Sequence, residues 1–130
     1  MNRRTINPWT WQEKFGFNQG HEVTGAERTL YLAGQTSLDD DGELVHVGDM
    51  VGQINKSIDN VEAVLAQAGM TLAHVVRLNI YTTDVDSLME NASALGRLNE
   101  AGCNYTSTLL GVARLAFPEL LVELEATAVA

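Results

Sequence analysis

Between Asp49 and Ala68, hydrophobic residues recur every three or four positions, which is the spacing of an amphipathic helix. A stripe with this interval lies on one face of the helix and indicates that this face is buried. Asp49 can cap the first turn, and Gly69 can end the helix. The sequence therefore predicts a long helix over residues 49–68. The apolar positions of the stripe are Met50, Ile54, Ile58, Val61, Leu65 and Ala68.

After this helix, the pattern changes to alternation. Over residues 76–81 apolar side chains alternate with polar or aromatic ones, which is typical of a strand with one buried face. A second helix is predicted to begin near Ser87, because a serine followed three residues later by Glu90 has the spacing of a capping box. Gly102 is predicted to end it.

The remaining β-prone segments lie towards the two ends of the chain. Residues 29–35 form an apolar strand candidate, with a predicted hairpin partner at residues 20–24. Two further strands are predicted at residues 106–115 and 120–128, joined by a short turn that contains Pro118. The predicted order is β-β-α-β-α-β-β, which is an α+β fold.

Composition adds limits to this picture. The chain has 130 residues, 45% of them hydrophobic, which is enough for one core, so a single domain over residues 1–130 is predicted. The net charge is -9, and the eight basic residues are spread singly apart from Arg3 and Arg4. Nucleic acid is therefore an unfavourable partner, because phosphate binding needs a basic patch.

Neither a metal site nor a membrane segment is predicted. Cys103 is the one cysteine, and His21, His46 and His74 do not have metal-ligand spacing, so we predict no disulfide, metal or cofactor. No apolar run approaches the roughly 20 residues that span a bilayer. No charged-then-apolar leader pattern opens the sequence, so the expected location is the cytoplasm.

Six short strings, taken together in order and spacing, resemble the RidA/YjgF family. The strings are Gly16–Gly20, Ala33–Gln35, Ile58–Val61, Tyr81–Asp84, Val112–Leu115 and Val122–Ala126. The resemblance implies a chorismate-mutase-like α+β fold, in which a mixed sheet is backed by two helices, and a homotrimer that binds small-molecule ligands in clefts between subunits. The best-known members hydrolyse reactive enamines or imines, such as 2-aminoacrylate, to a 2-keto acid and ammonia.

The resemblance also implies an arginine near the start of the penultimate strand, whose guanidinium holds the substrate carboxylate. Alignment on residues 112–115 puts Ser107 at that position, and alignment from residues 91–93 puts Thr108 there. Neither residue is an arginine. Arg77 is predicted to be a solvated or interface charge, so we do not assign this role to it.

Other positions depart from the family pattern in the same direction. The pocket tyrosine of the family corresponds to Phe17 or is displaced to Asn18, and a serine before the Gly34-Gln35 pair is Ala33. With fewer polar groups, the site is better suited to a larger or more apolar ligand than to a small carboxylate. The predicted substrate-binding residues are Trp11, Phe17, Asn18, Ala33, Gly34, Gln35, Asn91, Ser107 and Thr108.

Glu123 is the candidate catalytic residue, because it corresponds to a family glutamate that positions water or transfers a proton. Desolvation in a cleft would raise its pKa towards the range that is useful for acid-base chemistry. Alternation puts Glu123 and Glu125 on one face of the last strand, so an outer, solvated face is the alternative. Trp9 and Trp11 lie two residues apart and either form an aromatic wall of the cleft or pack the first segment against the body.

Two functions follow from these observations. The first is hydrolysis of an enamine, imine or related intermediate other than 2-aminoacrylate. The alternative is a non-catalytic trimer that binds or senses a metabolite. In both cases Phe17, Gln35, Ser107 or Thr108, and Glu123 are expected to converge on one intersubunit cleft.

Overall fold

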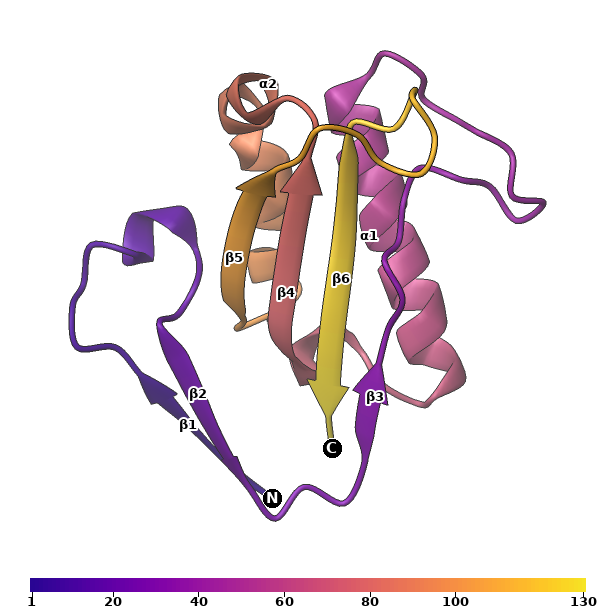
Figure 1. The fold of residues 1–130 in the computed structure, drawn as a ribbon. Coiled ribbons are helices and arrows are strands. Elements are labelled where there is room, and N and C mark those ends of the chain that lie inside the picture. The colour runs from indigo at the N-terminus through magenta and orange to yellow at the C-terminus, as the bar shows by residue number, and fades with distance from the viewer.

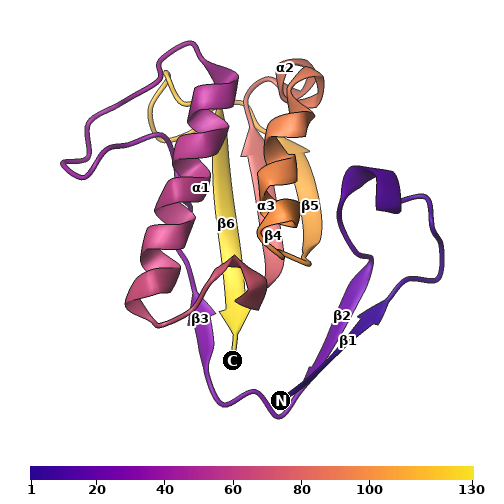
Figure 2. The same ribbon diagram turned by 180° about the vertical axis from the view of Figure 1, so that it is seen from behind.

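A computed structural model describes all 130 residues and has a four-stranded sheet at its centre, with helices on one face (Figures 1 and 2). A separate two-stranded hairpin lies beside the sheet. The strands are β1 (Asn2–Ile6), β2 (Gly20–Thr24), β3 (Thr29–Tyr31), β4 (Val75–Thr82), β5 (Thr106–Gly111) and β6 (Val122–Val129). The α-helices are α1 (Met50–Gln67), α2 (Val85–Glu90) and α3 (Gly96–Glu100), and the 3-10 turns are η1 (Glu13–Phe15), η2 (Leu72–His74) and η3 (Ala92–Leu95).

The order of strands in the central sheet is β3-β6-β4-β5. β6 is antiparallel to both of its neighbours, whereas β4 and β5 are parallel and are joined by the α2–α3 segment, as a parallel pair requires. One prediction of pairing was wrong, because β2 pairs with β1 and not with β3. The last two strands, β5 and β6, are separated in the sheet by β4.

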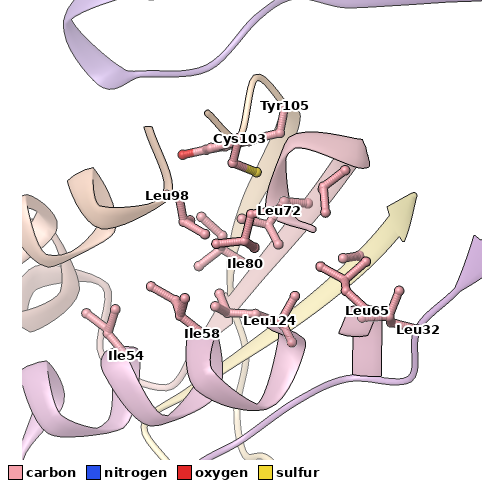
Figure 3. Close-up of a cluster of buried hydrophobic side chains, with 14 of the residues drawn as sticks. Leu32, Ile54, Ile58, Leu65, Leu72, Ile80, Leu98, Cys103, Tyr105 and Leu124 are labelled. Atoms are coloured by element: carbon pink, nitrogen blue, oxygen red, sulfur yellow. The ribbon is translucent and has the colours of Figure 1, made fainter. Parts of the chain in front are cut away.

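The core lies between the sheet and the helices, and it contains 19 buried hydrophobic residues. Alternate residues of β4 and β6 are buried on the face that the helices cover, and Figure 3 shows Ile54 and Ile58 of α1 lying towards Leu124 of β6. The predicted helical stripe is confirmed, since its residues from Met50 to Leu65 are buried. The predicted cap is confirmed too, because the backbone amide of Gly52 donates to Asp49 Oδ1 at 2.9 Å.

The second predicted helix is broken and begins earlier than expected. Asp84 is its cap, because the carboxylate accepts a hydrogen bond from the Ser87 amide at 3.0 Å, so Ser87 lies inside the first turn. At Asn91 the α2 helix ends and the 3-10 turn η3 leads into α3. The sheet is thus backed on one face by α1 and, beside it, by this segmented second helix (Figure 2).

The hairpin β1–β2 extends away from the edge of β5 and is held to the body by polar contacts (Figure 1). The guanidinium of Arg3 donates to the backbone carbonyls of Ala73, Val75 and Asn104 at 2.8, 2.7 and 2.6 Å. Hydrophobic alternation did not predict β1. Its position depends on these contacts with residues that lie far away in sequence.

The strand predicted over residues 29–35 is interrupted. β3 ends at Tyr31, but the Leu32 amide still donates to Ala126 O of β6 at 3.0 Å. The chain then bulges and pairs again with β6 at Gln35, whose amide donates to Leu124 O at 2.7 Å. This detour leaves Gly34 beside β6. No helix is both long and apolar enough to cross a membrane.

Candidate functional site

A cavity of about 840 Å³ lies between the η1 segment, the α2–α3 layer and strand β5. Three of the predicted substrate-binding residues line it, namely Trp11, Phe17 and Ser107. Its wall is mostly apolar. The lining residues are Trp11, Glu13, Lys14, Phe15, Gly16, Phe17, Ile80, Met89, Ala92, Ser93, Leu95, Gly96, Asn99, Tyr105, Ser107 and Leu109.

The η1 segment is fixed on α3 by Gly16 and Asn99. Gly16 has a φ of 77°, a left-handed conformation that favours glycine, and its carbonyl accepts a hydrogen bond from Asn99 Nδ2 at 2.7 Å. A Cβ at this glycine would lie 2.5 Å from Asn99 Oδ1, so a larger residue does not fit. Trp11 and Phe17 meet edge to face, with ring centroids 6.0 Å apart. Trp9 is 57% exposed and does not line the cavity.

Strand β5 presents its two candidate positions to opposite faces of the sheet. Ser107 is paired with the buried Leu78 and therefore points towards the helices and the cavity. Thr108 is paired with Asn79 on the open face, where its hydroxyl accepts a hydrogen bond from Arg77 Nη2 at 2.6 Å. Only Ser107 shares a cavity with Phe17.

Glu123 lies on the open face of the sheet and packs against Gly34. A Cβ built at Gly34 would be 1.9 Å from Glu123 Oε1, so the carboxylate occupies the space that a side chain would need. Desolvation by partial burial raises the pKa of Glu123, and the nearby charge of Glu125 raises it further. These shifts favour a protonated carboxyl at higher pH than is usual for glutamate.

Glu125 has a different environment on the same strand face. Its Oε1 accepts hydrogen bonds from Asn79 Nδ2 at 3.0 Å and from the Tyr81 hydroxyl at 3.1 Å. The hydrogen bond between the Tyr81 hydroxyl and Glu125 is the main reason that the pKa of Tyr81 is raised. Glu125 therefore has two donors, whereas Glu123 has no side-chain hydrogen-bond partner in the chain and remains available to a ligand or a water.

Within one chain the candidate residues form two separate groups. The segment of Gly34 and Gln35 lies beside β6, and β6 and β4 separate it from β5, so three strand spacings of about 4.8 Å lie between the groups. Glu123 and Ser107 also point to opposite faces. The expected convergence on one cleft therefore does not occur inside a single chain.

Three other predicted residues are engaged in local contacts. Asn18 Oδ1 accepts from Asn7 Nδ2 at 2.9 Å, and the Asn18 side-chain amide also donates to Asn104, so it holds the N-terminal segment next to β5. The side-chain amide of Asn91 donates to Ser87 O at 2.8 Å, at the end of α2. The carbonyl of Ala33 accepts from Gln35 Nε2 at 3.1 Å.

Sequence reasoning missed Lys14, Asn99 and Tyr105 in the cavity wall. Burial raises the pKa of Tyr105 to about 12, so its phenol stays neutral. Burial also raises the pKa of Cys103 to about 12, and with the residue only 1% exposed, its thiol is unsuited to act as a nucleophile. No three His, Cys, Asp or Glu side chains are grouped so that they could hold a metal ion.

Comparisons with known proteins agree with this fold. A family model described as endoribonuclease L-PSP matches residues 15–130. The crystal structure of YyfB from Yersinia pestis, a protein of unknown function of the conserved Rid protein family, is similar to this chain with a TM-score of 0.89 and 39% identity. That similarity covers 100% of both chains.

Two curated proteins are related over shorter stretches. Protein DfrA of Myxococcus xanthus is 33% identical over 81 residues, which are 62% of this chain and 61% of DfrA. The 3-aminoacrylate deaminase RutC of Acinetobacter baylyi is 31% identical over 62 residues, 48% of this chain and 49% of RutC. The matched stretches thus span about three fifths of the length of DfrA and about half of the length of RutC.

Proposed function

This chain belongs to the endoribonuclease L-PSP family and has the RidA/YjgF fold, and from that premise we propose that it hydrolyses an enamine or imine other than 2-aminoacrylate. In this reaction an enamine first takes up a proton on carbon and becomes an imine. Water then adds to the C=N carbon, the nitrogen is protonated, and ammonia leaves as the carbonyl forms. RutC, a relative over about half of the chain, is named as a deaminase of an aminoacrylate, which supports this class of reaction.

The observation that carries the proposal is the shared cavity of Trp11, Phe17 and Ser107. Trp11 and Phe17 come from the N-terminal segment and Ser107 from β5, about 90 residues later, and two of the three lie at positions that the family resemblance implies for substrate contact. A volume of about 840 Å³ is within the range of small-molecule sites. The apolar wall, and the serine that stands at position 107 in place of an arginine, favour a substrate larger than 2-aminoacrylate.

We further propose a homotrimer in which Glu123 of one copy faces the cavity of its neighbour. Two features support this arrangement. First, Glu123 and the cavity are separated within one chain and need a second copy to meet. Second, the open face of the sheet is not covered, and it exposes Tyr31 by 79% and Leu110 by 49%. The raised pKa of Glu123 suits a group that gives a proton to the leaving nitrogen and takes one from water.

RNA cleavage is not the activity that we propose, although the family description contains the word endoribonuclease. The net charge of -9 opposes phosphate binding. Several arginines are also engaged within the chain, since Arg97 contacts Asp59 and Glu62 and Arg4 contacts Glu22.

The second candidate function is metabolite binding without turnover. It is favoured by the cavity wall itself, whose titratable groups are Glu13, Lys14 and a neutral Tyr105, with no histidine or buried carboxylate. Catalysis therefore depends on Glu123 reaching the cavity from a neighbouring copy. If it does not, the cavity is suited to binding alone.

One assay separates the two functions. An amino-acid oxidase, with catalase present, generates 2-imino acids from alanine, leucine or phenylalanine, and semicarbazide traps the imine that remains. We expect the protein to shorten the lifetime of the leucine and phenylalanine imines, and we expect Glu123→Gln to remove the effect while folding is retained. Ligand binding by the wild type without any acceleration would instead establish the binding function.

A further inference from the structure

We infer that Lys14 provides the cation that binds an anionic substrate, and that this substrate is a carboxylic acid with an apolar body of more than three carbons. The inference rests on the proposed function, because it concerns the same cavity. It assigns the role that an arginine at position 107 would have to a residue from a different segment of the chain.

Lys14 is the one cation among the 16 residues of the cavity wall. Arg77, the other cation that the sequence offered for this role, donates a hydrogen bond to Thr108 on the opposite face of the sheet. Arg97 belongs to α3, and its guanidinium contacts Asp59 and Glu62 of α1 at 2.5 and 2.8 Å. An anion in this cavity therefore has Lys14 as its cationic partner within the chain.

The local structure holds Lys14 at the cavity. It lies in the middle of η1, where the amides of Phe15 and Gly16 donate to the carbonyls of Gln12 and Glu13 at 2.9 and 3.1 Å. Asn99 then fixes the end of this turn on α3. The Lys14 ammonium is 5.2 Å from the centroid of the Phe15 ring, which is itself part of the wall.

The chemistry of the surrounding wall defines the rest of the ligand. Beyond the ammonium, the wall contains Trp11, Phe17, Leu109 and Ile80, which suit an aromatic or branched aliphatic group. A net charge of -9 opposes the approach of anions, so a bound acid needs a local cation. Lysine acts as a mobile point charge, which tolerates acids of different length better than a fixed guanidinium fork does.

Matched probes test this inference on the full-length protein. We would measure binding of 3-phenylpropanoate, its neutral amide 3-phenylpropanamide, and pyruvate by calorimetry. Quenching of Trp11 fluorescence in a Trp9→Phe background locates binding at the cavity, because Trp9 lies outside the wall. The variants are Lys14→Met, Lys14→Arg and Lys56→Met, the last being a control at the only other lysine, which lies on α1.

We expect the wild type to bind 3-phenylpropanoate about tenfold more tightly than the amide, as is typical of one charge-assisted contact. Pyruvate should bind more weakly than 3-phenylpropanoate. Lys14→Met should remove the preference for the acid over the amide, whereas Lys14→Arg and Lys56→Met should keep it.

Each contrary result overturns a separate part of the reasoning. Equal affinity for acid and amide in the wild type, or a preserved preference in Lys14→Met, would overturn the role of Lys14 while the cavity and the proposed function stand. Tighter binding of pyruvate than of 3-phenylpropanoate would overturn the inference that the ligand has an apolar body. If no probe binds and imine lifetimes are unchanged, both this inference and the proposed function fail.

Discussion

Gly34→Ala is a sharp test of the role of Glu123, because the two residues compete for the same space. An added Cβ would lie 1.9 Å from Glu123 Oε1, 2.6 Å from Cδ and 2.9 Å from Cγ. Non-bonded heavy atoms are at their optimal separation at about 3.5 Å, so the carboxylate must move by roughly 1.5 Å. Gly34 does not have a positive φ, and its backbone therefore accepts alanine.

The expected effects on folding and on function differ in size. The flexible Glu123 side chain has to move from its Cγ outward while the backbone stays in place, which costs about 0.5–1.5 kcal/mol if Glu123 takes a strained rotamer. A misplacement of about 1 Å at a reacting group can cost about a hundredfold in rate. Gly34→Ala should therefore fold normally in urea denaturation and lose about a hundredfold in imine hydrolysis.

Two further variants make the test specific. Gly20→Ala is the matched control, because its new Cβ would lie 3.4 Å from Ile6, an ordinary contact, and its φ is not positive. Adding Gly34→Ala to Glu123→Gln should cause no additional loss, since both act on one carboxylate. Full turnover in Gly34→Ala would refute the assignment of Glu123 to the reaction.

Further predictions concern the core, the acid-base group and the arginine position. Leu124→Ala should lower the free energy of unfolding by about 2–5 kcal/mol in urea titrations, since this side chain is fully buried. The raised pKa of Glu123 stabilises the fold at low pH, and this contribution is lost as pH rises through the folded-state pKa. In urea titrations at successive pH values, the free energy of unfolding of Glu123→Gln should therefore increase relative to the wild type as pH rises from the unfolded-state pKa to the folded-state pKa of Glu123. In a dehydratase-coupled assay, Ser107→Arg should raise 2-aminoacrylate hydrolysis by about a hundredfold, whereas Thr108→Arg, which faces the other side of the sheet, should not.

Features set by local spacing were predictable from the sequence. The α1 stripe and its Asp49 cap depend on residues within a few positions of one another, so periodicity was sufficient. Alternation also predicted correctly that Glu123 and Glu125 share a strand face. The pairing of β3 was not predictable in this way, because its partner, β6, lies about a hundred residues later in the chain.

The site depended more strongly on long-range contacts. Lys14 has no sequence feature that distinguishes it from a solvated lysine, and it reaches the cavity because Asn99, 83 residues away from Gly16, fixes the end of its turn. The choice between Ser107 and Thr108 likewise needed the register with β4, which decides the face of each side chain.

The distribution of charge gives the two halves of the proposed cleft different roles. Lys14, Phe17 and Ser107 form a wall that can bind an apolar acid, whereas Glu123 lies on the open face with a raised pKa and no partner among the side chains of its own chain. An ionised Glu123 beside a bound carboxylate would repel it, so the protonated form is favoured when the acid binds. Binding and acid catalysis would thus reinforce each other, because a substrate anion held by Lys14 raises the fraction of Glu123 that can donate a proton.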